Sequence, residues 1–264
     1  MANPRILVIA GSDSSGGAGI QADLKTAQTF GVYVQTAVTA VTVQNTHGVT
    51  AVHPVPAAIV RGQILAALND IGADAIKIGM LGNAEIAACV ADVLSETEEI
   101  RAIPLVLDTV MLSSSGAPLL DEAGVEILKK RLIRRSLVVT PNLPETEAIS
   151  GVYPRSDHRL RNAAMAFKIL GAANVLFKGG HGDGDIVRDT LWTGAEEFVP
   201  FESPRQATHH THGTGCTLAT AIASGIAQGK PLIDAVERAH LFVQNAIRTA
   251  PQLGGGAGPL NHKG

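Results

Sequence analysis

The sequence has little of what marks several large classes of protein. Cys89 and Cys216 are its only cysteines, so it offers neither a disulfide framework nor a Cys-x-x-Cys metal site. Basic and acidic residues nearly balance at a formal net charge of −3, which gives nucleic-acid binding through phosphate neutralisation little support. No apolar run is long enough to span a membrane, and the first one is too short for a signal peptide. We therefore expect a reduced, soluble, cytoplasmic protein that binds neither nucleic acid nor membrane.

Aromatic residues are scarce as well, at 3% of the chain, while 45% of its 264 residues are hydrophobic. The core must therefore be built from Ala, Val, Ile and Leu, with enough apolar material for one large α/β domain or two small ones. Gly-x-x-x-x-Gly-Lys-[Ser/Thr] is absent, which excludes a P-loop fold. Gly17, Gly19 and Ala22 loosely match a dinucleotide fingerprint, but the second expected strand ends at Gln44 and Asn45 without the acid that holds a ribose. A dehydrogenase is therefore disfavoured.

Strand-like apolar runs alternate with helical patterns along the whole chain. The expected strands are 5–10, 34–43, 75–78, 105–108, 137–140 and 174–178, with an antiparallel pair at 189–192 and 197–201. The expected helices are 21–30, 56–72, 83–94, 121–135, 145–150, 159–170, 216–228 and 231–249. This order predicts one domain, 1–264, with a mostly parallel sheet, helices on both faces and a loose glycine-rich tail at 254–264.

Ligands of such sheets bind outside the carboxyl ends of the strands. That rule selects the residues directly after the strands, which are 11–19, Gln44, 79–80, Asp108, Asn142 and 178–182. The functional site is therefore expected along this single edge of the sheet.

A glycine-rich turn, 211–217, leads directly into an apolar helical segment. The start of a helix has unpaired N–H groups and partial positive charge, which suit an anion or a developing negative charge. Cys216 lies in this turn, where a thiolate is favoured. The alternative is that the glycines only begin a helix. His209, His210 and His212 precede the turn and suggest a metal site, but loop hydrogen bonds are the favoured interpretation because no second ligand set follows.

Four further strand-end positions have chemical potential and a structural alternative. The amide of Gln44, near Asp23 at the beginning of the first helix, suits the edge of a nitrogen heterocycle, or is a solvated strand end. Asp108 and Glu145 suit Mg²⁺ held through waters, or Glu145 is a first-turn helix acid. Lys178 suits phosphate oxygens, or is a lysine that extends to solvent from its strand.

Taken together and in this order, the motifs resemble one family. They are the segments 10–23, 41–46, 77–81, 108–111, 140–145, 178–181 and 212–217. The chain resembles the hydroxymethylpyrimidine/phosphomethylpyrimidine kinases of thiamine biosynthesis, within the ribokinase-like superfamily, and the likeness covers nearly its whole length. The opening loop together with Gly213-Thr214-Gly215-Cys216 is specific, whereas a single motif is not.

The resemblance implies a ribokinase-like three-layer sandwich that transfers phosphate from ATP with Mg²⁺, first to the hydroxymethylpyrimidine and then to its monophosphate. It implies an anion hole at Gly213, Thr214, Gly215 and Cys216, with Cys216 where sugar kinases of this fold carry a base aspartate. The pyrimidine contacts it implies are Gln44, Asp23, Gly11, Met80, Val106 and Leu107. The nucleotide and metal contacts it implies are Lys178, Asn142, Asp108, Thr214 and Glu145. By analogy, related kinases are often homodimers.

Three positions depart from the family pattern. Thr109 replaces the usual proline after Asp108, the lysine often found near Ser114 is missing, and His240 stands where a lysine is common. The first two concern a flap over the site, and the third concerns one nucleotide contact of the family. Two alternatives stay open, a pyridoxal kinase and a non-catalytic pyrimidine-binding protein on the same fold.

Overall fold

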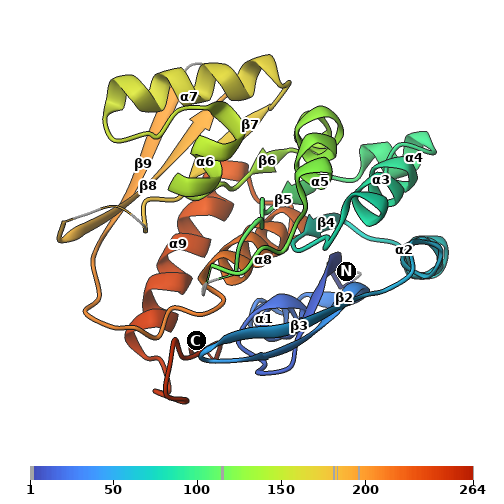
Figure 1. The fold of residues 1–264 in the computed structure, drawn as a ribbon. Helices are drawn as coiled ribbons and strands as arrows, with labels where there is room; N and C mark the ends of the chain where they lie inside the picture. Colours follow the sequence, from blue (N-terminus) through green and yellow to red (C-terminus); the bar gives the residue numbers. More distant parts are fainter. Residues whose placement is uncertain (1–2, 114–115, 181, 183, 196, 264) are drawn as a thin grey trace.

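The computed structural model describes residues 3–113, 116–180, 182, 184–195 and 197–263 (Figure 1). Over these ranges the strands form one nine-stranded sheet in the order β3-β2-β1-β4-β5-β6-β7-β8-β9. The strands are β1 (Arg5–Asp13), β2 (Tyr33–Asn45), β3 (Gly48–Pro54), β4 (Ala75–Ile78), β5 (Leu105–Leu107), β6 (Val138–Val139), β7 (Asn174–Phe177), β8 (Ile186–Thr193) and β9 (Glu197–Pro204).

The sheet is parallel in its centre and antiparallel at both edges. β1 pairs in parallel with β2 and β4, and parallel pairing continues through β5 and β6 to β7. β3 is antiparallel to β2, and β8 and β9 form an antiparallel edge beside β7. The mostly parallel sheet and the antiparallel pair are as predicted. β3 was not predicted, because most of its residues are exposed and it lacks the apolar run of a buried strand.

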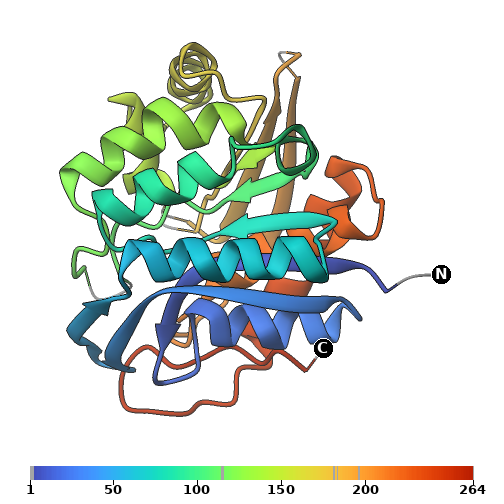
Figure 2. The same ribbon diagram turned by 90° about the vertical axis from the view of Figure 1, so that its right-hand side faces the viewer.

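Helices cover both faces of the sheet (Figure 2). They are α1 (Gly19–Thr29), α2 (Ala57–Asp70), α3 (Ala84–Val93), α4 (Glu98–Ala102), α5 (Glu122–Ile127), α6 (Leu143–Ser150), α7 (Asp157–Ile169), α8 (Thr214–Ala227) and α9 (Leu232–Arg248). Alternate residues of β1 supply the two cores: Leu7 and Ile9 face the core under α2 to α7, while Ile6 and Val8 face the core under α1, α8 and α9. The predicted three-layer α/β sandwich is confirmed.

The expected helix over 121–135 is regular only in its first part. Asp121 caps α5 by accepting from the Gly124 N–H, as a helix-starting acid should. After Ile127 the chain widens into a π-helical turn, Leu128–Leu132, and then tightens into a 3-10 turn, Ile133–Arg135. The Arg135 guanidinium donates to the carbonyls of Leu94, Ile100 and Ile103, which ties this irregular end to α3 and α4.

The glycine-rich segment expected to be a loose tail packs back onto the body of the protein. Ala257 N–H donates to the carbonyl of Thr46, and His212 N–H donates to the carbonyl of Gly258. Leu260 is buried, and the buried ring of His262 lies 2.9 Å from the hydroxyl of Thr217 in α8. Residues 257–262 therefore lie against the turn before α8 rather than away from the fold. No helix in the described ranges is long and apolar enough to cross a membrane.

Candidate active site

Parallel pairing continues one residue past the strand ends and aligns polar residues along one edge of the sheet. Gly79 N–H donates to the Ile9 carbonyl, and Asp108 N–H donates to the Ile78 carbonyl, each at 2.9 Å. Lys178 N–H donates to the Pro141 carbonyl at the same distance. These positions lie at the carboxyl edge, where ligands of open α/β sheets bind.

The turn before α8 is built as an anion site. Gly213 caps α8 in the left-handed conformation, with φ +85°, and a side chain there would collide with the Gly17 carbonyl, so the position requires glycine. Within the described part of the chain, no acceptor is present for the N–H groups of Gly215 and Cys216. Thr214 N–H is different, because it donates to the Thr211 carbonyl at 3.2 Å. Two amides of the turn are thus free to bind an anion.

Lys178 and Asp108 lie directly opposite this turn. A β-carbon at Gly215 would lie 3.3 Å from Lys178 Nζ and 3.4 Å from Asp108 Oδ2, so glycine keeps the space between them open. Lys178 Nζ donates to Asp108 Oδ1 at 2.8 Å, and its distance to Glu145 Oε2 is 3.9 Å. Thr140 donates to the same Asp108 oxygen at 3.1 Å. The structure therefore brings together one lysine, two carboxylates and two free amides.

Glu145 has the helix-start role that the sequence offered as one alternative, and its carboxylate lies near Lys178. It is the third residue of α6 and completes a capping box, accepting from Asn142 N–H while Asn142 Oδ1 accepts from Glu145 N–H. The same Oε2 accepts a hydrogen bond from the hydroxyl of Thr109 at 3.0 Å. Burial raises the pKa of Glu145, and the Lys178 charge opposes that rise. Thr109, one of the departures from the family pattern, thus supports the carboxylate.

Cys216 does not have the lowered pKa that its place in the turn suggested. Burial raises the pKa of its thiol to about 11, although the Lys77 ammonium acts in the opposite direction. The nearby carboxylates of Asp23 and Asp108 raise the pKa further. The lowered pKa expected for this thiol is therefore not found, because desolvation outweighs the Lys77 charge.

Asp23 is not placed to touch a ligand. Its side chain is fully buried, both carboxylate oxygens lie 3.0 Å from Lys77 Nζ, and Thr220 donates to Oδ1 at 2.6 Å. Burial alone would lower the pKa of Lys77, but the Asp23 carboxylate outweighs it and raises the pKa. The expected pairing of Asp23 with Gln44 at one ring is therefore corrected to a buried ion pair beneath the site.

Val106 and Leu107 are also enclosed. Both side chains are fully buried in the two cores on opposite faces of β5, so they do not frame a ligand. Gly11 and Met80 do lie together: a β-carbon at Gly11 would lie 2.8 Å from the sulfur of Met80. Of the expected ring contacts, Gln44 is half-buried, whereas Gly11 and Met80 are buried at the carboxyl edge of the sheet.

Gln44 belongs to a polar chain that sequence reasoning missed. Gln44 Nε2 lies 3.4 Å from Nε2 of His212, which lies 2.8 Å from Oδ2 of Asp13. Asp13 also accepts from the N–H groups of Ser15 and Ala18. Burial alone would raise the pKa of Asp13, but these bonds outweigh it and hold the pKa at about 2. The only signal in the sequence was an acid inside a glycine-rich loop.

The three histidines do not meet at one site. His212 contacts Asp13, and the rings of His209 and His210 lie against each other at a tilt of 44°, with their centroids 4.0 Å apart. Across the described residues, no group of three or more His, Cys, Asp or Glu side chains is arranged to hold a metal ion. Ser114 lies outside the described residues. His240 is buried and contacts Ser203 and Asp189.

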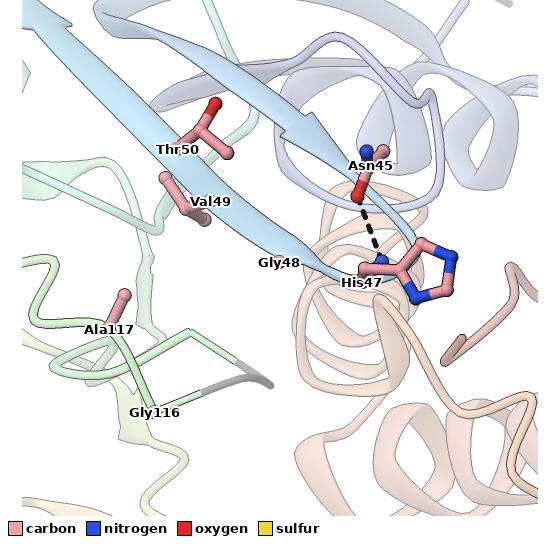
Figure 3. Close-up of a pocket in the computed structure, with 7 residues that line it drawn as sticks. All are labelled: Asn45, His47, Gly48, Val49, Thr50, Gly116 and Ala117. Atoms are coloured by element: carbon pink, nitrogen blue, oxygen red, sulfur yellow. Dashed lines mark hydrogen bonds between the residues drawn. The ribbon is translucent and has the colours of Figure 1, made fainter. Parts of the chain in front are cut away.

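A cavity of about 490 Å³ lies between the β2–β3 turn and the loop before α5 (Figure 3). Asn45 and His47 line it from the turn, where Asn45 Oδ1 accepts from the His47 N–H, and Gly116 and Ala117 line it from the loop. Neither the turn before α8 nor Lys178 lines this cavity. The candidate site residues at the edge of the sheet therefore do not line this cavity.

An α/β sandwich with free helix-start amides facing a lysine and two carboxylates defines a small-molecule kinase of the ribokinase-like fold. The sequence pattern of the family described as phosphomethylpyrimidine kinase matches residues 13–261. The chain belongs to this family, and membership of a kinase family implies the use of ATP.

Individual relatives agree with this assignment. The hydroxymethylpyrimidine/phosphomethylpyrimidine kinase of Haemophilus influenzae is 45% identical, over 98% of this chain and 96% of that protein. The thiamine biosynthesis bifunctional protein ThiED of Geobacter sulfurreducens is 48% identical over 97% of this chain, which spans 52% of that protein's length. The pyridoxal kinase of Staphylococcus aureus, solved with AMP-PCP and pyridoxal, is 34% identical at a TM-score of 0.89, covering 100% of this chain and 94% of that one.

Proposed function

We propose that the chain phosphorylates 4-amino-5-hydroxymethyl-2-methylpyrimidine and then its monophosphate, with ATP as donor, in thiamine biosynthesis. The observation that carries this proposal is the pair of free amides at Gly215 and Cys216, facing Lys178 and Asp108. The kinase named after both substrates in Haemophilus influenzae supports the substrate class. Phosphoryl transfer requires positioning and charge neutralisation, and this edge of the sheet supplies both.

In the proposed reaction the turn before α8 binds the phosphoryl group during transfer. The free amides of Gly215 and Cys216 would point their partial positive charge at its oxygens. Lys178 neutralises phosphate charge from the opposite side. Cys216, as a thiolate, takes the proton of the substrate hydroxyl. The hydroxyl oxygen then bonds to the γ-phosphorus of ATP, and the bond from that phosphorus to ADP breaks. Because the pKa of this thiol is about 11, its thiolate is a strong base, but only a small fraction of molecules carry it at neutral pH.

The two carboxylates suit a magnesium ion that keeps most of its waters. Asp108 and Glu145 flank Lys178, and no third His, Cys, Asp or Glu joins them as a metal ligand in the described ranges. Mg²⁺ favours one or two carboxylates plus substrate phosphates over an all-protein cage. When bound, the ion would offset phosphate charge, and Asn142 and Thr214 would serve as further nucleotide contacts.

The ring of the substrate would lie against Gln44, Gly11 and Met80. The amide of Gln44 offers a donor and an acceptor together, which matches an amino group beside a ring nitrogen. A pyridoxal ring is similar in size but lacks that pair of groups, so we expect the aminopyrimidine to be preferred. The likeness to pyridoxal kinases does not decide the substrate, because related enzymes share the fold.

A substrate panel tests the proposal. The purified chain is given Mg-ATP with the hydroxymethylpyrimidine, its monophosphate or pyridoxal, and ADP and phosphorylated products are measured. We expect mono- and diphosphate products and a kcat/KM for the pyrimidine at least about tenfold above that for pyridoxal. A preference for pyridoxal would overturn the substrate. Pyrimidine binding without ADP release would favour the non-catalytic alternative.

The homodimer expected by analogy is also a proposal. β2 and β3 form a hairpin at the edge of the sheet on which Val41, Val43 and Val52 are exposed. An exposed apolar edge is a surface that a second copy of the chain would cover. Sedimentation velocity should show a dimer that Val43→Lys weakens, and a monomer at all concentrations would overturn this part.

A further inference from the structure

Three buried polar side chains form a chain of contacts beside the proposed nucleotide site. Ser203 is on β9, His240 on α9 and Asp189 on β8, and each is at most 9% exposed. Ser203 Oγ lies 2.7 Å from His240 Nε2, and His240 Nδ1 lies 2.9 Å from Asp189 Oδ2. Figure 1 shows α9 running next to the β8–β9 edge, where these contacts form.

The chain of contacts ends at the turn that follows β7. The second oxygen of Asp189, Oδ1, accepts a hydrogen bond from the N–H of Gly179 at 2.8 Å. Because a carboxylate only accepts, Nδ1 of His240 must carry a hydrogen toward Asp189. Nε2 then faces the Ser203 hydroxyl. The backbone at Gly179 is therefore connected through Asp189 to a ring on α9.

Gly179 is held closely on its other side as well. A β-carbon there would collide with the backbone of Arg188, so the turn lies directly against β8. The residue before it is Lys178, whose ammonium is 2.8 Å from Asp108 and beside Gly215. A hydrogen bond that fixes the Gly179 amide therefore also fixes the backbone of Lys178 and the direction of its side chain.

A buried polar network is costly unless every member is satisfied, and an apolar packing of similar volume is often no less stable. Stability alone therefore does not explain why three polar groups meet here. Their common end point is the turn next to the phosphate-facing lysine. That position suggests a role in orienting the site.

We propose that His240 is a positioning residue for nucleotide phosphates, which acts through Asp189 on the Gly179 amide and so on Lys178. The inference rests on the proposed phosphate-binding role of Lys178. His240 itself touches neither phosphate nor substrate in this proposal. His240 instead holds the turn that contains Gly179 in its binding conformation before nucleotide binds, which is a form of preorganisation.

Two amide variants separate the contacts of His240. In His240→Asn the side-chain amide occupies the place of Nδ1 and retains a donor to Asp189. In His240→Gln the amide reaches the place of Nε2 and retains only the contact with Ser203. We expect His240→Gln to raise the Kd for ADP and the KM for ATP about fivefold, equivalent to one hydrogen bond. His240→Asn and Ser203→Ala should stay within about twofold of the parent, and the KM for the pyrimidine should not change.

The measurements are calorimetric titration of ADP, steady-state kinetics and melting temperature for each variant. If His240→Asn and His240→Gln weakened nucleotide binding equally, and in proportion to the fall in their melting temperatures, the network would be purely structural. That result would overturn the proposal. Labelling of Ser203 by a fluorophosphonate would also overturn it, because the same three residue types then act as a nucleophile system. A parent protein that binds no ADP would instead refute the proposed function, so the two failures are distinguishable.

Discussion

At the scale of a single residue, the state of Cys216 determines how the reaction depends on pH. With a thiol pKa of about 11, roughly one molecule in 10⁴ carries the thiolate at pH 7, and that fraction rises tenfold with each pH unit up to about 11. If the thiolate is the base, kcat rises with the same slope between pH 7 and 10. Cys216→Ala should be slower by about 10²–10⁴ at the upper end and should show no such slope.

The control for this prediction is Cys89→Ala. Cys89 is half-buried on α3, where its thiol donates to the Ala57 carbonyl, away from the turn before α8. That variant should keep the profile of the parent. A flat profile in the parent, shared by Cys216→Ala, would show that the backbone amides of the turn carry catalysis without a thiolate.

Glu145 allows charge to be separated from helix capping. Glutamine serves at the third position of a capping box, so Glu145→Gln should keep α6 and change the melting temperature little. It removes the negative charge beside Lys178, 3.9 Å away. We expect the Mg²⁺ concentration for half-maximal activity to rise about tenfold, as for one lost charge-assisted bond. An unchanged Mg²⁺ requirement would remove Glu145 from the metal site.

At the scale of an element, Asp13 holds the glycine-rich loop between β1 and α1. Its pKa is about 2 in the folded protein against an ordinary 3.8, so the depressed value stabilises the fold by about 2 kcal/mol above pH 4. That contribution is lost as the pH falls from about 4 toward 2. Asp13→Asn should therefore lower the free energy of unfolding by about 2 kcal/mol at pH 7 and by less at pH 3. Urea denaturation at both pH values measures this.

The matched control for the loop is Asp70→Asn, at an exposed position at the end of α2. It should leave the free energy of unfolding within about 0.5 kcal/mol of the parent at both pH values. If Asp13→Asn lowered the free energy of unfolding as much at pH 3 as at pH 7, the loss would not come from the carboxylate charge. That result would contradict the stabilising role given to the depressed pKa of Asp13.

What the sequence could predict follows from which interactions are local. The alternation of apolar runs placed β1, β4 and β7, and the strand-end rule placed Asp108 and Lys178 on one edge. The buried pair of Asp23 and Lys77 joins residues 54 positions apart, and no local pattern marks it. The raised pKa of Cys216 depends on burial by distant segments, which the residues of the turn do not reveal.

At the scale of the whole molecule, the C-terminal segment connects pH to the active site. The buried ring of His262 contacts Thr217 in α8, and His212, before the turn, donates its N–H to Gly258. Burial lowers the pKa of His262 to about 4, with a further contribution from the charge of Lys25. The ring is therefore held neutral in the folded chain, and its protonation favours release of this segment.

The sign of the resulting pH dependence follows from that lowered pKa. Above pH 6.5 the ring is neutral in both states, and below that value the unfolded chain takes up the proton first, so stability falls as the pH drops toward 4. Between pH 7 and pH 5 the loss is about 2 kcal/mol in the free energy of unfolding. His262→Gln cannot titrate but still offers an amide to Thr217. In urea denaturation, this variant should therefore lack the loss of about 2 kcal/mol in the free energy of unfolding between pH 7 and pH 5. The exposed-site variant His53→Gln should keep the loss, and an equal loss in all three proteins would show that His262 does not link acidity to the C-terminal segment.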